Sequence, residues 1–101
     1  MEKQASDVLR GRIERFQESN VDPAWLARKL HSAGIIGGND VEVASNEREL
    51  AAKRRGDLLL TVMGNGAPDV FQTFVNILLS ERHLKWLGEE LKGMMRASTP
   101  H

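Results

Sequence analysis

The segment from Asn46 to Met63, NERELAAKRRGDLLLTVM, constrains the fold of this chain more than any other stretch. Asn46 followed by Glu49 is a variant of the helix capping box, so a helix is expected to begin here. The first half of the segment is charged and contains Lys53, Arg54 and Arg55 in succession. The second half is apolar: Leu58, Leu59, Leu60, Val62 and Met63. We therefore expect one long helix whose apolar half is the centre of a small core and whose basic half lies at the surface.

Start and stop signals predict five further helices around this one. Asp22 and Pro23 suit the cap and first position of a helix, and Ala33-Gly34 suits a helix end. The expected helices begin near Ser6, Pro23, Asp40, Asn46, Pro68 and Ser80, and the ends marked by turn residues are Ser19, Gly34, Ser45, Gly64 and Gly93. The alternation Val41-Glu42-Val43 would also suit a strand, but no second strand pattern exists to pair with it.

Length and composition favour a single all-α domain. A chain of 101 residues is one domain by length, and the predicted helices with their tight turns indicate a six-helix antiparallel bundle over residues 1–93, followed by a disordered tail over 94–101. The absence of cysteine favours a cytoplasmic setting. The polar start MEKQASD does not resemble a signal peptide, and no apolar run is long enough to cross a membrane.

The sequence offers no catalytic, metal-binding or cofactor-binding residue set. His31, His83 and His101 are far apart in the sequence and have no metal-ligand spacing. Gly64-Asn65-Gly66 lacks both the preceding strand and the lysine of a phosphate-binding loop. We therefore expect a binding module rather than an enzyme, with no cofactor and no metal.

Charged residues of opposite sign concentrate in different parts of the chain. The bases gather at Arg10, Arg12, Arg15, Lys53, Arg54 and Arg55, and the acids at Asp40, Glu42, Glu47 and Glu49. Ordinary solvated helix faces with local ion pairs would explain both groups. Alternatively, two patches of opposite sign allow the domain to dock on a relative or on a copy of itself.

The order of helices and two apolar segments resemble the caspase recruitment domain (CARD) of the death-fold superfamily. The first segment is Trp25-Leu26-x-x-x-Leu30-x-x-x-Gly34-Ile35-Ile36, and the second is Gly66 followed by Phe71-x-x-Phe74-x-x-x-Leu78. The resemblance covers residues 6–93. This chain departs from the family pattern at Asn65, where a base is common, at Gly56, and in a slightly longer spacing from Gly66 to Phe71.

The resemblance implies homotypic recruitment of another CARD-containing protein: an initiator caspase, an adaptor or a scaffold in apoptotic or inflammatory signalling. In the family's commonest contact, a basic patch on the first and fourth helices meets an acidic patch on a partner. The matching bases are Arg10, Arg12, Arg15, Lys53, Arg54 and Arg55, and the matching acids are Asp22, Asp40 and Glu42. Because Met1 lies shortly before the first helix, we expect the domain to open its parent protein, with the remainder beyond His101.

Two alternatives remain open from the sequence. A nucleic-acid-binding helical module could use the same arginines on phosphates, but the 14 basic and 14 acidic residues cancel, and such modules usually carry a net positive charge. A death domain, death effector domain or pyrin domain would keep the homotypic function and change the partners. A break in the first helix, which is common in CARDs, would favour the CARD among these subfamilies.

Overall fold

The computed structural model describes residues 3–98, which form an all-helical domain with no strand in that range. The α-helices are α1 (Lys3–Arg10), α2 (Ile13–Gln17), α3 (Pro23–Ser32), α4 (Gly38–Ala44), α5 (Ala51–Met63), α6 (Val70–Leu79) and α7 (Lys85–Ser98), and a 3-10 helix, η1 (Arg82–Leu84), precedes α7. The predicted all-α class is confirmed. The predicted count of six is wrong, because this range contains seven α-helices.

The extra helix arises because the expected first helix is interrupted at Gly11 and Arg12. Gly11 N still bonds to Asp7 O, but Arg12 N bonds to Leu9 O, three residues back, and Arg12 adopts φ −121° and ψ 9°. Glycine is a poor helix former, so the chain turns here at little cost. The expected start at Ser6 is also wrong, since α1 already includes Lys3.

Local signals placed the ends of α3 correctly. The Asp22 carboxylate accepts a hydrogen bond from Ala24 N at 3.1 Å, and Pro23 occupies the first helical position. Gly34, just past the helix, has φ +77°, the left-handed conformation that glycine adopts without strain. Helix α4 begins two residues earlier than Asp40, whose carboxylate accepts from Gly37 N at 3.0 Å. Val41 and Val43 are thus helical, as expected.

The expected start of the central helix at Asn46 is wrong by five residues, because α5 begins at Ala51. The Asn46 side chain accepts from Arg48 N at 3.1 Å and forms a local turn. Leu50 then has ψ 139°, which is extended backbone, so a helix cannot pass through it.

The last α-helix begins at Lys85, later than the start near Ser80 that the sequence predicts. Ser80 caps the end of α6 instead of the start of the next helix, and its hydroxyl donates to Ile77 O at 2.6 Å. Gly93 does not end α7, which continues to Ser98. Of the expected disordered tail, residues 94–98 are therefore helical, and 99–101 lie outside the described range.

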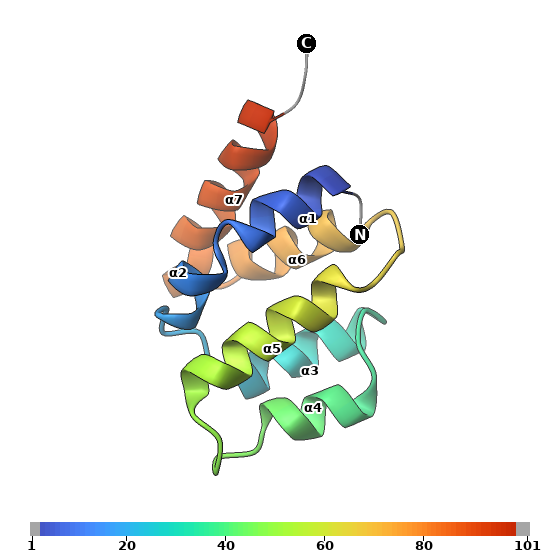
Figure 1. The fold of residues 1–101 in the computed structure, drawn as a ribbon, viewed down its shortest axis with the longest axis vertical. Coiled ribbons are helices and arrows are strands. Elements are labelled where there is room, and N and C mark those ends of the chain that lie inside the picture. The colour runs from blue at the N-terminus through green and yellow to red at the C-terminus, as the bar shows by residue number, and fades with distance from the viewer. Residues whose placement is uncertain (1–2, 99–101) are drawn as a thin grey trace.

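The helices form two tiers around one core (Figure 1). Helix α7 packs on both α1 and α6 in the upper half of the view, whereas α3, α4 and α5 pack together in the lower half. Helix α2 lies against α5 at the junction of the tiers. None of the helices in the described range is long and apolar enough to span a membrane.

Large apolar side chains from both tiers fill the core, including Phe16, Leu26, Leu59, Phe74 and Leu87. The rings of Phe16 and Phe74 lie 6.1 Å apart in a tilted arrangement. Leu58, Leu59 and Val62 are buried, as predicted from the sequence. Leu60 is not part of the core, because it is 53% exposed.

Candidate partner-binding surface

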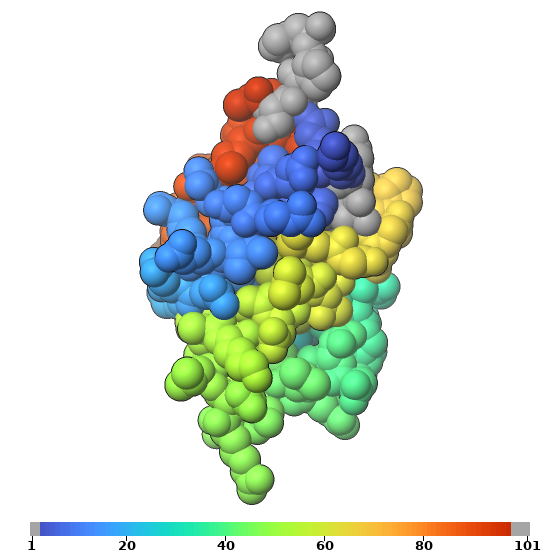
Figure 2. Space-filling view, in the orientation of Figure 1, coloured from blue at the N-terminus to red at the C-terminus, as the bar shows by residue number. Residues whose placement is uncertain are grey.

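The predicted basic residues lie on neighbouring elements although they come from two separate parts of the sequence. Arg10 ends α1, Arg12 lies in the turn before α2, Arg15 is on α2, and Lys53 to Arg55 are on α5. Helix α5 packs against α2 and also contacts α1. In the space-filling view these three helices form one continuous face (Figure 2). The side chains on that face nevertheless differ in how freely a partner could reach them.

Arg55 is bound to the backbone of the α2–α3 connection. Its Nε donates to Val21 O at 2.6 Å, and its Nη1 donates to Gln17 O, the last residue of α2, at 3.1 Å. Burial lowers the pKa of the Arg55 guanidinium below its usual value, the Arg54 charge lowers it further, and the Asp22 carboxylate opposes both. Arg55 therefore holds α2 to α5, and two of its five N–H donors bind backbone carbonyls.

Gly56 leaves room for the Gln17 side chain where α2 packs on α5. A Cβ atom at this position would lie 2.5 Å from Gln17 Nε2 and 3.1 Å from Gln17 Cδ. Gly56 is buried in the middle of α5, where glycine costs roughly 1 kcal/mol of helix stability relative to alanine. The side chain of Gln17 occupies the space that this glycine leaves.

Arg54 likewise binds backbone carbonyls, in this case those of the α4–α5 connection. Its Nη1 donates to Ala44 O, at the end of α4, at 2.8 Å, and its Nε donates to Glu49 O at 3.1 Å. A guanidinium group suits these carbonyls, because the end of a helix leaves backbone acceptors without partners. The Arg54 side chain is only partly exposed.

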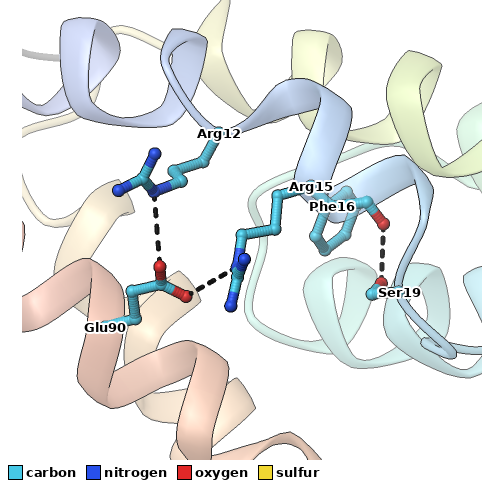
Figure 3. A network of polar contacts seen from close by, with 5 residues as sticks. All are labelled: Arg12, Arg15, Phe16, Ser19 and Glu90. Carbon is cyan, nitrogen blue, oxygen red and sulfur yellow. Dashed lines mark hydrogen bonds and ion pairs between the residues drawn. The ribbon is translucent and has the colours of Figure 1, made fainter.

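Arg12 and Arg15 share one carboxylate on α7 (Figure 3). Arg15 Nε lies 3.1 Å from Glu90 Oε2 and is hydrogen-bonded to it, whereas Arg12 Nε lies 3.5 Å from Glu90 Oε1. The Arg12 Nε atom is buried and has no hydrogen-bond partner among the described residues. The guanidinium carbon of Arg15 also lies 5.4 Å from the centre of the Trp86 ring, within the range of a cation–π contact.

Arg10 and Lys53 are the most accessible of the predicted bases. Their side chains are 68% and 60% exposed, and each makes an ion pair within its own helix region: Arg10 with Asp7 at 3.6 Å and Lys53 with Glu49 at 3.3 Å. Exposed ion pairs of this kind are weak, about 0–1 kcal/mol. A partner could therefore displace them easily.

The predicted acids lie on α4 and at the start of α3. Asp40 and Glu42 share α4, which packs on α3 after a short connection. Asp22 caps the start of α3, and its charge acts on Arg55. Asp40 caps α4 through Gly37 N, whereas Glu42 is exposed and makes no ion pair with the residues described.

Sequence reasoning missed Glu90, Trp86 and Gln17, which determine how the basic residues are held. Trp86 and Glu90 are four residues apart on α7 and so lie on one helix face, which is the only sequence signal that links them. Nothing in the sequence indicates that α2 lies beside them. Residues 3–98 contain no group of histidines, aspartates or glutamates that could hold a metal ion.

No protein-family model, curated protein or solved structure matches this chain.

Proposed function

We propose that this domain is a non-enzymatic, homotypic interaction module of the CARD type that acts in the cytoplasm. In this proposal it recruits another CARD-containing protein, an initiator caspase, adaptor or scaffold, in apoptotic or inflammatory signalling. The bases on α1, α2 and α5 would meet an acidic surface of the partner.

The observation that carries this proposal is the meeting of two separate basic segments on one face. Arg10 to Arg15 and Lys53 to Arg55 are far apart in the sequence, yet α2 packs directly on α5. A face that gathers bases can attract an acidic patch on a partner, and the balance of 14 basic and 14 acidic residues weakens the long-range attraction to nucleic acid. The interruption at Gly11 and Arg12 supports the CARD among death-fold subfamilies, because a break in the first helix is common in CARDs.

The accessible bases Arg10 and Lys53 provide the sharpest test. Arg10→Glu and Lys53→Glu should each weaken capture of a CARD partner by about tenfold or more, because reversing a charge replaces attraction with repulsion. The measurement is a pull-down of the domain against purified CARDs and other death-fold domains at low and moderate salt. Arg54→Glu is a poor choice, because it would also remove the bonds to Ala44 and Glu49.

Lys92→Glu provides the matched control, since Lys92 is an exposed base on α7, away from α5. It changes the net charge by the same amount and should leave capture unchanged. If all three reversals weaken capture equally, general charge and not this face drives binding. Binding to duplex DNA or RNA with a steep salt dependence, and to no death-fold domain, would favour the nucleic-acid alternative.

A further inference from the structure

We infer that Arg12 and Arg15 form an exchangeable carboxylate site, which Glu90 fills in the isolated domain and which an acidic side chain of the partner takes over on binding. This inference rests on the proposed function, and it identifies the point of entry on the basic face. It also assigns Glu90 a role, as an internal competitor of the partner.

The charges at this site are unequal. Two guanidinium groups face one carboxylate, so the cluster retains one positive charge after internal pairing. Glu90 hydrogen-bonds only Arg15, while Arg12 Nε remains buried without a hydrogen bond to any residue described. Because the Arg12 Nε donor lies 3.5 Å from Glu90 Oε1 without forming a hydrogen bond, Glu90 satisfies this site incompletely. A carboxylate that engaged both guanidinium groups would bind better than Glu90 does.

The site is open enough for exchange. The side chains of Arg12, Arg15 and Glu90 are 36%, 56% and 26% exposed, so solvent reaches part of each one, although the Arg12 Nε atom itself is buried. Trp86, 44% exposed, lies against Arg15 and provides a firm platform beside the carboxylate position. An aromatic side chain next to an arginine is a common composition for the energetic centre of an interface.

The site also adjoins the rest of the basic face. Arg12 and Arg15 flank the start of α2, and the carbonyl of Gln17 at its other end is held by Arg55 of α5. Arg12 and Arg15 thus belong to the helix that Arg55 holds, and their side chains reach toward Glu90 of α7 (Figure 3). The occupant that fits is an aspartate or glutamate side chain of a folded partner, because the site offers two guanidinium groups and one aromatic ring.

Glu90→Gln tests this inference, because the amide keeps the size and a hydrogen-bond acceptor for Arg15 but removes the competing charge. Affinity for the CARD captured above should rise about two- to fivefold, the upper part of the range expected for releasing one partly exposed ion pair. Glu89→Gln is the matched control, since Glu89 is exposed on the same helix and lies with Lys85, Lys92 and Arg96 on another side. It should change affinity less than twofold, and Arg15→Gln added to Glu90→Gln should abolish the gain.

Two outcomes would overturn the inference: equal gains in affinity from Glu90→Gln and Glu89→Gln, or a lower affinity of the Glu90→Gln variant. Thermal unfolding must show that both variants are folded.

A second measurement on the wild-type protein needs no natural partner. A short poly-glutamate peptide should shift the Nε–Hε NMR signals of Arg12 and Arg15 before those of Arg54 and Arg55. If no CARD in the panel binds the domain while these signals shift, the proposed function fails and the carboxylate site stands. If the signals do not shift, the site itself is refuted.

Discussion

Arg55 is the last of three consecutive bases, and its side chain donates hydrogen bonds to the protein's own backbone. Val21 O and Gln17 O accept these donors, and Arg54 serves Ala44 O and Glu49 O in the same way. Only Lys53 in this run points its charge mainly to solvent, with a weak partner in Glu49. Three adjacent bases thus have different uses, which depend on the elements that pack beside each one.

Arg55→Ala should destabilise the domain by about 1–3 kcal/mol, because two carbonyl groups lose their donors and α2 loses its attachment to α5. Lys53→Ala, two residues away, should change the free energy of unfolding by less than about 0.5 kcal/mol, as expected for a surface substitution. Urea unfolding followed by circular dichroism measures both. Similar effects in the two variants would show that the Arg55 bonds contribute little to stability.

At the scale of elements, two glycines of α7 differ in how closely neighbouring atoms pack against them. A Cβ at Gly88 of α7 would lie 2.9 Å from Leu79 Cδ2 and 3.2 Å from Leu79 N, so this glycine allows α7 to meet the end of α6. A Cβ at Gly93, on the same helix, would meet nothing within 4 Å. The first position therefore has a packing reason, and the second has none.

Gly88→Ala should destabilise the domain by about 1–3 kcal/mol through overpacking, because a backbone atom of α6 cannot give way as a side chain can. Gly93→Ala should instead stabilise it by about 0.5–1 kcal/mol, since alanine favours the helix and restricts the unfolded chain. Thermal melts of the two variants beside wild type would measure the difference. A stabilised Gly88→Ala variant would contradict the close approach of α6 and α7.

Helices with local signals at their ends were predictable from the sequence, and those that depend on distant contacts were not. Asp22-Pro23 and Gly34 determine their own backbone, so the limits of α3 were correct. The start of α5 depends on the extended Leu50, and the length of α7 depends on Met94 and Met95, which pack against the core. The grouping of bases on two segments could likewise be read from the sequence, but their partners Glu90 and Gln17 could not, because these contacts form only when α2 meets α5 and α7.

At the scale of the whole molecule, one core joins the two tiers, and α5 contributes to it with only part of its apolar run. Leu59 is 1% exposed and Leu60 is 53% exposed, although the two are adjacent in an unbroken run of leucines. A helix turns about 100° per residue, so neighbouring side chains face different directions. Apolar composition alone therefore does not identify the core side of α5.

Leu59→Ala should destabilise the domain by about 2–5 kcal/mol, because it removes buried apolar surface and leaves a cavity. Leu60→Ala should cost less than about 1 kcal/mol, because that side chain already contacts water. Guanidinium unfolding of the two variants under identical conditions gives the comparison. Equal losses would mean that Leu60 is buried in solution, for example against a second molecule.

The packing of α1 on α7 also affects how this domain is made in the cell. Leu9 of α1 and Leu91 of α7 belong to the same core, so the earliest helix to leave the ribosome lacks its final neighbour until the latest has been synthesised. During that interval the nascent chain exposes apolar side chains from helices that are already complete, and such surfaces favour aggregation. The part of α1 that α7 covers therefore stays without its neighbour until the last helix of the domain has been synthesised.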